Sequence, residues 1–382
     1  MIRSISIKNF KSLNDINFEL PNMSLIVGHN GAGKSNLLSA IKFISLLTSG
    51  RQLDVVLEVL NILPNEFFYN DNLPKAEFAL DLNIKSKSVR YEFEIIRQPG
   101  ENGLSVGKEL LRVQGDEVLK REGNFSVRMK QDNDNFTNAP IVNNQLALSV
   151  FQGSKIVIEV KNWLSKIIVD TFEPILLKNY GLASKSDSSL SSTLAEKLYI
   201  LKTNQPSIFQ EVISVFRKVI HGLETVDVEL TSTGNLLLQI KESNMNRVYR
   251  SFSASNGNLR TMGIILALYG EPKLSAIFID EIENALHPSR IHSVVDAIRF
   301  LAQNEQNRPQ IVMTTHNPVL LDYIAPEQIV YCYKKNGETH FVNPYKNESV
   351  MYELQQSKKE NLNLSELFAS GTLENIFTSD IQ

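Results

Sequence analysis

The chain has 382 residues and a single cysteine, Cys332. One cysteine excludes a disulfide framework within the chain, and this usage fits a reducing, cytoplasmic compartment. No stretch approaches the roughly 18 uninterrupted apolar residues of a membrane-spanning helix. The first residues alternate like a strand and lack the apolar core of a signal peptide. We therefore expect a cytoplasmic protein with no membrane partner.

A dominant sign of charge is also missing. The 39 Lys and Arg residues nearly balance the 42 Asp and Glu residues, which leaves a net charge of −3. The composition therefore lacks the basic signature of many nucleic-acid-binding proteins, although a local patch can still bind DNA. Basic residues recur between positions 155 and 218, and we interpret them as a solvated helix face rather than a phosphate-contacting surface.

Residues 28–35 read Gly-His-Asn-Gly-Ala-Gly-Lys-Ser, between an apolar run and a helical pattern. Glycines let the loop turn its N–H groups toward phosphates, and the helix start adds a positive dipole end. Lys34 is expected to reach the β- and γ-phosphates of a nucleotide, and the Ser35 hydroxyl to bind Mg²⁺. The predicted nucleotide-binding residues are Asn30, Gly31, Ala32, Gly33, Lys34, Ser35 and Asn36.

Two further apolar runs end in polar residues. Residues 276–279 are followed by Asp280 and Glu281, as in a strand buried on both faces whose carboxyl end lies at a ligand site. Asp280 is expected to hold Mg²⁺, and Glu281 to orient or deprotonate the attacking water. The run 311–315 ends at His316, which could sense or stabilise the γ-phosphate. The alternatives are a solvated acidic pair and a structural histidine.

Residues 253–260 lie between a predicted hairpin and a predicted helix. Ser255 could cap that helix, and Gly257 would allow a close backbone approach. Without the other motifs, a simple capped turn would be the default interpretation.

The order of these stretches resembles the ABC-type ATPase head, in the RecF/SMC/OLD-like branch of AAA family ATPases. Residues 9–13, Asn-Phe-Lys-Ser-Leu, are similar to that branch's "NF-[KR]-S" segment. Residues 280–288 are similar to its "DEPE-x-x-LHP" stretch, with Ile282 in place of proline. Ser255-Asn256-Gly257 stands where the family has a degenerate "LS-x-G" signature.

This resemblance implies an α/β P-loop NTPase fold: a mostly parallel core sheet, an antiparallel β lobe and a helical insert. The predicted domains are a split ATPase core (1–50 and 225–345), a β lobe (51–130), a mostly helical insert (131–224) and a helical tail (346–382). The residue pattern further predicts a hairpin connection at residues 85–88, a polar loop at 131–138, mostly helical structure over 145–180 and a helix break at Pro206. It also predicts an apolar face at residues 362–373 that packs on the chain's own core or on a partner. The resemblance implies ATP and Mg²⁺ as ligands and a head-to-head homodimer, with a higher oligomer left open. Ser255 and Gly257 would act in trans, Asn284 would lie at the dimer seam, and Lys34, Glu281 and His316 would be catalytic.

Several features of particular branch members are absent from the sequence, and each absence argues against membership of that subgroup. The insert between the two halves of the site lacks the sustained heptads of SMC arms, and one cysteine cannot supply a C-x-x-C zinc hook. After the predicted strand at Tyr331 only about 50 residues remain, too few for a Toprim nuclease domain. Asp132-Asn133-Asp134 is interpreted as a solvated loop. We expect no nuclease chemistry in this polypeptide.

Four functions compete. The first is an ATPase that regulates a separate effector, a nuclease or toxin, in bacterial anti-phage defence associated with DNA. The alternative is a RecF-like DNA-repair ATPase that binds DNA directly. A transporter ATPase subunit is least favoured, because the signature is degenerate and the insert is large. Glu281 argues for turnover rather than a binding module without hydrolysis.

Overall fold

The computed structural model describes residues 1–98, 103–122, 126–132, 135–178, 181–182, 193–269, 273–303, 309–357 and 363–378. The chain divides into two compact units. Unit 1 comprises Met1–Val169, Ser275–Asp280 and Gln310–Gln382, and unit 2 comprises Asp170–Leu274 and Glu281–Pro309. The four ranges predicted from the sequence are a different division and stay predictions.

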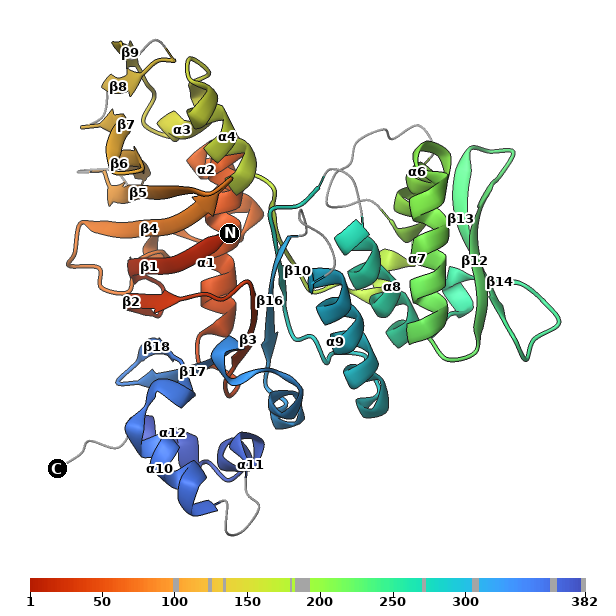
Figure 1. The fold of residues 1–382 in the computed structure, drawn as a ribbon. Helices are drawn as coiled ribbons and strands as arrows, with labels where there is room; N and C mark the ends of the chain where they lie inside the picture. Colours follow the sequence, from red (N-terminus) through yellow and green to blue (C-terminus); the bar gives the residue numbers. More distant parts are fainter. Residues whose placement is uncertain are drawn as a thin grey trace. The chain divides into compact units, whose positions relative to one another are not determined.

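Unit 1 contains an eight-stranded antiparallel sheet in the order β2-β1-β4-β5-β6-β7-β8-β9 (Figure 1). Every second residue of β4 is buried, as the alternating sequence predicts. Lys85 and Ser86 both have positive φ and form the predicted tight hairpin between β4 and β5. The strands are β1 (Ile2–Phe10), β2 (Leu13–Glu19), β4 (Lys75–Ile84), β5 (Lys87–Arg97), β6 (Leu104–Val113), β7 (Asp116–Arg121), β8 (Ser126–Lys130) and β9 (Phe136–Pro140).

The second sheet of unit 1 is the mostly parallel core that the sequence predicted, in the order β10-β15-β16-β3-β17-β18. β3 is parallel to both β16 and β17, β15 is parallel to β16, and β18 is antiparallel to β17. Every residue of β3, β15 and β16 is buried, as expected for strands covered on both faces. The strands are β3 (Met23–Val27), β10 (Ile167–Asp170), β15 (Ala276–Ile279), β16 (Gln310–Thr315), β17 (Ile329–Lys335) and β18 (Glu338–Val342).

An aromatic cluster packs α1 (Lys34–Thr48) against the eight-stranded sheet. Phe43 of α1 lies 5.5 Å from Phe78 of β4, ring centroid to centroid, and Phe78 stacks on Phe93 of β5 at 4.9 Å. Phe10 packs edge-on to Phe67 at 5.0 Å. The helix that follows the phosphate loop is thereby anchored in a rigid core. The remaining helices and 3₁₀ turns of unit 1 are α2 (Leu53–Val59), η1 (Pro64–Glu66), α3 (Ala147–Val150), α4 (Lys155–Leu164), η3 (Pro318–Tyr323), η4 (Pro326–Gln328), η5 (Pro344–Lys346), α10 (Glu348–Ser357), α11 (Leu364–Ala369) and α12 (Thr372–Thr378).

Unit 2 combines helices with a small antiparallel sheet (Figure 1). Helix α7 buries Phe209, Val212, Ile213 and Phe216 along one face, and the predicted break at Pro206 separates it from α6. The elements are α5 (Pro174–Leu177), β11 (Gly181–Leu182), α6 (Leu194–Asn204), α7 (Pro206–Val219), β12 (Leu223–Leu230), β13 (Asn235–Glu242), β14 (Tyr249–Arg250), η2 (Ser251–Ser253), α8 (Asn256–Tyr269) and α9 (Pro288–Gln303).

Two local expectations were wrong. Residues 145–180 were expected to be mostly helical, but Ile167–Asp170 forms β10 at the edge of the core sheet. A short apolar run carries no periodicity that separates strand from helix, so pairing with β15 decides. Residues 131–138 were expected to form a polar loop, yet Phe136–Pro140 pairs with β8; residues 133–134 lie outside the described residues. Within the described part of the chain, no helix is long and apolar enough to cross a membrane.

Candidate nucleotide site

The core sheet brings the predicted motifs to one edge. β15, β16 and β3 are neighbours, and their registers pair Ile279 with Met313 and Thr315 with Val27. The Gly28 amide, directly after β3, donates to the Thr315 carbonyl at 3.3 Å. Parallel strands place their carboxyl ends on the same side, so the phosphate loop, Asp280 and His316 share this edge.

The loop can adopt its path only with glycine at specific positions. Gly31 and Gly33 have φ of 81° and 112°, in the left-handed region that other residues avoid. A Cβ added to Gly33 would lie 2.0 Å from Thr339 Oγ1, and one added to Gly28 would lie 2.2 Å from the Cys332 carbonyl oxygen. Glycine is therefore required in this loop for two reasons: the backbone conformation at Gly31 and Gly33, and the close contact of Gly28 with β17 and of Gly33 with β18.

Lys34 is the first residue of α1, and its ammonium group folds back into the loop. Its side chain is 7% exposed, and Nζ donates to the carbonyls of Gly28 at 2.5 Å and His29 at 3.0 Å. Asn30 and Ser35 are exposed beside it. A cation within a glycine-rich loop, next to an exposed hydroxyl at a helix start, fits the phosphates of a nucleotide and a hard cation bound with them.

Two side chains far from the loop in sequence, Ser12 and Thr339, support it. Only Ser12 belongs to a motif that the sequence analysis recognised. Asn36 Nδ2 donates to Ser12 Oγ at 2.6 Å, and Ser12 Oγ lies 2.7 Å from Thr339 Oγ1. Thr339 Oγ1 in turn donates to the Ala32 carbonyl at 3.0 Å. Ser12 belongs to the segment 9–13 singled out above. Thr339 gave no sequence signal, because a single threonine in an edge strand is unremarkable.

Lys11 in the same segment also lies near α1. It has a positive φ of 48°, and its Nζ donates to Ser39 Oγ at 3.3 Å. Partial burial lowers the pKa of Lys11, which Glu66 partly offsets. The segment 9–13 therefore contacts α1 at two points, through Ser12 and Lys11, close to the end of the phosphate loop.

Asp280 is held by a residue that sequence reasoning missed. Thr314 Oγ1, in the neighbouring strand β16, donates to Asp280 Oδ1 at 2.5 Å, and Thr314 is fully buried. His316 follows β16 at the same edge and is exposed. The only sequence signal for Thr314 is a polar side chain within the apolar run 311–315.

Glu281 begins a tight turn in unit 2. Its φ of 46° is left-handed, and its carbonyl accepts from the Asn284 amide at 2.8 Å. Ala285 is also left-handed, with φ of 56°, while Ile282 is fully buried where the resemblance has proline. Asn284 is exposed at the tip of this turn.

The predicted signature segment packs against that turn within unit 2. Ser255 Oγ accepts from the Asn258 amide at 3.1 Å, which is the helix cap predicted from the sequence. A Cβ added to Gly257 would lie 2.7 Å from the Ala285 carbonyl oxygen, which confirms the expected close approach. Ser255 itself is exposed at the start of α8.

The C-terminal helices pack on unit 1 itself. Phe368 of α11 stacks on His29 of the phosphate loop, with ring centroids 4.7 Å apart and 12° between planes. His29 Nε2 also lies 3.5 Å from Glu374 Oε2 of α12. The apolar face expected in this tail is therefore buried on the tail's own unit, beside the loop.

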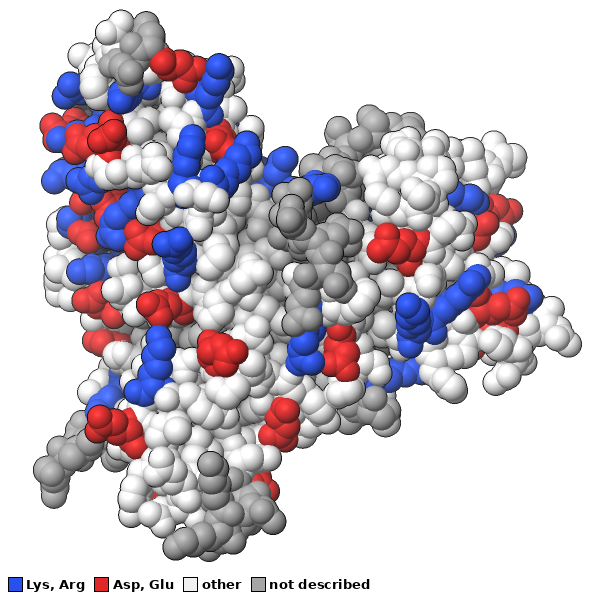
Figure 2. All heavy atoms as spheres, in the orientation of Figure 1, with Lys and Arg blue, Asp and Glu red and all other residues white. Residues whose placement is uncertain are grey.

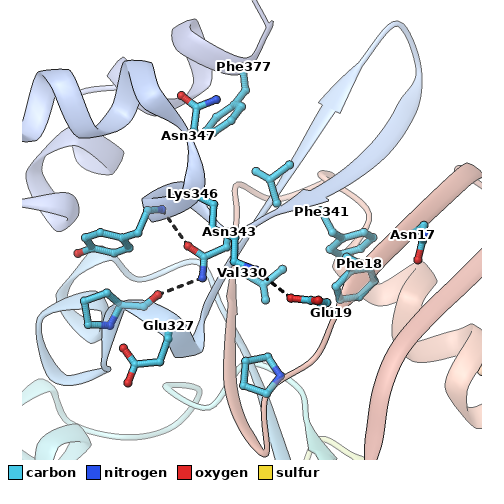
Figure 3. Close-up of a pocket in the computed structure, with 14 residues that line it drawn as sticks. Asn17, Phe18, Glu19, Glu327, Val330, Phe341, Asn343, Lys346, Asn347 and Phe377 are labelled. Carbon is cyan, nitrogen blue, oxygen red and sulfur yellow. Dashed lines mark hydrogen bonds and ion pairs between the residues drawn. The ribbon is translucent and has the colours of Figure 1, made fainter. Parts of the chain in front are cut away.

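A groove of about 790 Å³ lies elsewhere in unit 1, between β2, β17 and β18 (Figure 3). Phe18 and Phe341 stack in it at 4.6 Å, and Lys346 pairs with Glu19 at 2.8 Å. The residues that line it include none of the phosphate loop. It is therefore separate from the candidate nucleotide site.

Together, the phosphate loop with its buried lysine and the acid at the end of a nearby parallel strand define a P-loop ATPase. Residues 23–322 match the family described as "AAA domain, putative AbiEii toxin, Type IV TA system", and the chain belongs to this family. It is 21% identical over 379 residues to an "ATP/GTP phosphatase" of Helicobacter pylori, covering 92% of this chain and 97% of that protein.

Solved structures show the same fold. The SmcHead bound to the C-winged helix domain of ScpA aligns with a TM-score of 0.58 and 15% identity, over 89% of this chain and 97% of that one. The Smc head with an extended coiled coil, bound to the C-terminal domain of ScpA from Pyrococcus furiosus, aligns with a TM-score of 0.56 and 13% identity, over 93% and 99%. The expected RecF/SMC-like ABC ATPase fold is confirmed, and the protein is an ATP-hydrolysing enzyme.

Proposed function

We propose that this ATPase closes as a homodimer around ATP, and that its open and closed states control a separate effector protein, a nuclease or toxin, in bacterial anti-phage defence. The observation that carries the dimer is the geometry of Ser255. Its Oγ accepts from the Asn258 amide while the residue stays exposed. A hydroxyl that accepts at its oxygen keeps its own proton to donate. Ser255 is therefore suited to donate to a phosphate oxygen held by a second subunit.

The other residues take the following roles in this proposal. Residues 30–36 cradle the phosphates, with the Lys34 ammonium as the counter-charge. Ser35 and Asp280 hold Mg²⁺, which when bound would neutralise phosphate charge. Glu281 accepts a proton from the attacking water, and His316 contacts the γ-phosphate. Gly257 lets the signature segment approach the nucleotide of the second subunit closely, and Asn284 lies at the seam between subunits.

Two findings support a separate effector. The family description names a putative toxin and a type IV toxin–antitoxin system, and an SMC head of the same fold was solved bound to another protein, ScpA. Direct DNA binding stays the alternative. In Figure 2, Lys and Arg interleave with Asp and Glu over β4–β7 of unit 1, in pairs such as Arg90–Asp81 at 2.9 Å and Lys75–Glu94 at 2.8 Å. Paired charges of both signs largely cancel beyond a Debye length of about 10 Å.

The dimer is tested with Glu281→Gln, which should bind ATP without hydrolysing it and accumulate the closed form. Light scattering after size exclusion should give twice the monomer mass with ATP and Mg²⁺, and the monomer mass without nucleotide. Adding Ser255→Arg should abolish the dimer, whereas Ser253→Arg, at an exposed serine two residues earlier, should preserve it. A Glu281→Gln protein that stays monomeric with saturating ATP rules the proposal out.

The effector is tested by affinity purification from the native host. Glu281→Gln with ATP and Lys34→Ala would be used as baits, with mass spectrometry of the bound proteins. We expect one nuclease or toxin to bind one of the two states preferentially. Equal recovery of the same proteins with both baits contradicts nucleotide control. Stimulation of ATP hydrolysis by DNA ends, with no effector recovered, would favour the DNA-repair alternative.

A further inference from the structure

An arginine buried in unit 2 links the signature helix to the glutamate that follows β15. Arg260 lies five residues after Ser255 in α8 and is 0% exposed. Its Nη2 donates to the Glu281 carbonyl at 2.8 Å, and its Nη1 donates to the Thr171 carbonyl. These two hydrogen bonds from a fully buried guanidinium tie the Thr171 backbone to the Glu281 backbone.

The charge of Arg260 is balanced inside the same unit. Burial lowers its pKa, while the nearby carboxylates of Glu173, Glu283 and Asp170 act in the opposite direction. An arginine stays protonated even then. The guanidinium therefore acts as a permanent, directional pair of donors rather than as a titrating group.

The backbone held by Arg260 is under strain. Glu281 has φ of 46°, a left-handed conformation that is unfavourable for a non-glycine residue and persists only when its surroundings fix it. The signature segment also packs on the end of this turn, because a Cβ added to Gly257 would lie 2.7 Å from the Ala285 carbonyl oxygen. Asn258 accepts a further hydrogen bond from Arg290 of α9, the helix that follows the turn. Residues 255–260 and 281–285 are consequently packed against each other. The hydrogen bond from Arg260 to the Glu281 carbonyl is the charged contact between them.

We propose that Arg260 is a positioning residue that couples the two composite sites of the dimer. Through its hydrogen bond to the Glu281 carbonyl, Arg260 makes the orientation of Glu281 depend on the position of α8. A signature serine engaged on the partner's nucleotide thereby sets the glutamate that acts on the subunit's own nucleotide. This inference rests on the proposed function, because it takes Ser255 to act in trans and Glu281 to be the general base. Neither the nucleotide nor the attacking water is touched by Arg260 in this account.

The test is Arg260→Met, with Arg260→Lys as the conservative variant. We expect Arg260→Met to lower kcat by about 10–100-fold and to leave the KM for ATP within about twofold, since only the orientation of a catalytic group is lost. Arg260→Lys should recover part of kcat, because an ammonium can still donate to a carbonyl. Arg260→Met should also accumulate the ATP-bound dimer without Glu281→Gln, because hydrolysis is slowed while Ser255 is intact.

The matched control is Arg121→Met in unit 1. Arg121 is 1% exposed and donates to the carbonyls of Gln145 at 2.9 Å and Val142 at 3.4 Å. The Arg121→Met variant should have a lower melting temperature than the wild type, while its kcat per folded molecule stays unchanged. The inference fails if Arg260→Met keeps its kcat, if its KM rises tenfold along with the loss, or if Arg121→Met loses as much kcat. If Glu281→Gln itself stays monomeric, the dimer proposal falls, and the kcat and KM of Arg260→Met still decide whether Arg260 positions Glu281.

Discussion

Replacing Thr314 by valine removes one hydroxyl from Asp280 with little change in side-chain shape. Thr314 Oγ1 donates to Asp280 Oδ1 at 2.5 Å from a fully buried position, so water cannot take its place without repacking β16. A hydrogen bond to a charged group contributes about 1.5–3 kcal/mol. Loss of a partner that orients a metal-binding carboxylate typically costs about 10–100-fold in metal affinity or activity. We expect Thr314→Val to show both effects.

The assay is ATP hydrolysis at saturating ATP as a function of Mg²⁺ concentration. The concentration that gives half-maximal activity should rise by about 10–100-fold, and the free energy of unfolding without Mg²⁺ should fall by up to about 3 kcal/mol. Thr315→Val is the matched control, because Thr315 is equally buried and its Oγ1 accepts from the Asn317 amide at 2.9 Å. A Mg²⁺ curve unchanged in Thr314→Val, or shifted equally in Thr315→Val, refutes this account of Asp280.

Three other outcomes follow from the structure. Lys34→Ala should abolish binding of a fluorescent ATP analogue, since the phosphates lose their counter-charge; retained binding would contradict the role of the loop. Glu109→Gln should lower the free energy of unfolding in urea by about 1–3 kcal/mol, because both Glu109 oxygens accept from the amides of Ala147 at 2.6 Å and Leu148 at 2.8 Å, and a side-chain amide turns one acceptor into a donor. Burial raises the pKa of Cys332 to about 12 from 9.0, so the stability tied to the protonated thiol is complete below pH 9 and is lost as the pH rises toward 12; urea unfolding should show this extra loss against Cys332→Ala.

The Glu109 and Cys332 predictions each have a matched comparison. For Glu109, Tyr91→Phe should cost less than Glu109→Gln, because Tyr91 donates to a carboxylate oxygen that keeps the Leu148 amide as a partner. Equal losses in the two variants would contradict the argument from acceptors. For Cys332, parallel stability curves of the wild type and Cys332→Ala between pH 9 and 12 would show that the thiol is not protected by burial.

The phosphate loop shows how far local sequence reaches. The conformation of residues 28–35 depends on glycines at fixed offsets and on a lysine at the first position of a helix, all within one contiguous stretch. The positions of Asp280 and His316 were predictable as well, because apolar runs buried on both faces imply parallel strands, and parallel strands end on the same side of a sheet. The capping role of Ser255 is equally local, since the Asn258 amide is three residues away.

What the sequence by itself determined is therefore which residues are candidates for the nucleotide site and at which edge of the core sheet the phosphate loop, Asp280 and His316 lie. The tertiary structure alone decided what holds them there. Thr314 orients Asp280 from another strand, Thr339 closes on Gly33 from the far end of the chain, and Arg260 fixes the backbone of Glu281. Each contact joins residues far apart in sequence through a single side chain. Such a residue produces no periodicity or motif spacing in the sequence, because its role depends on which group the fold places opposite it.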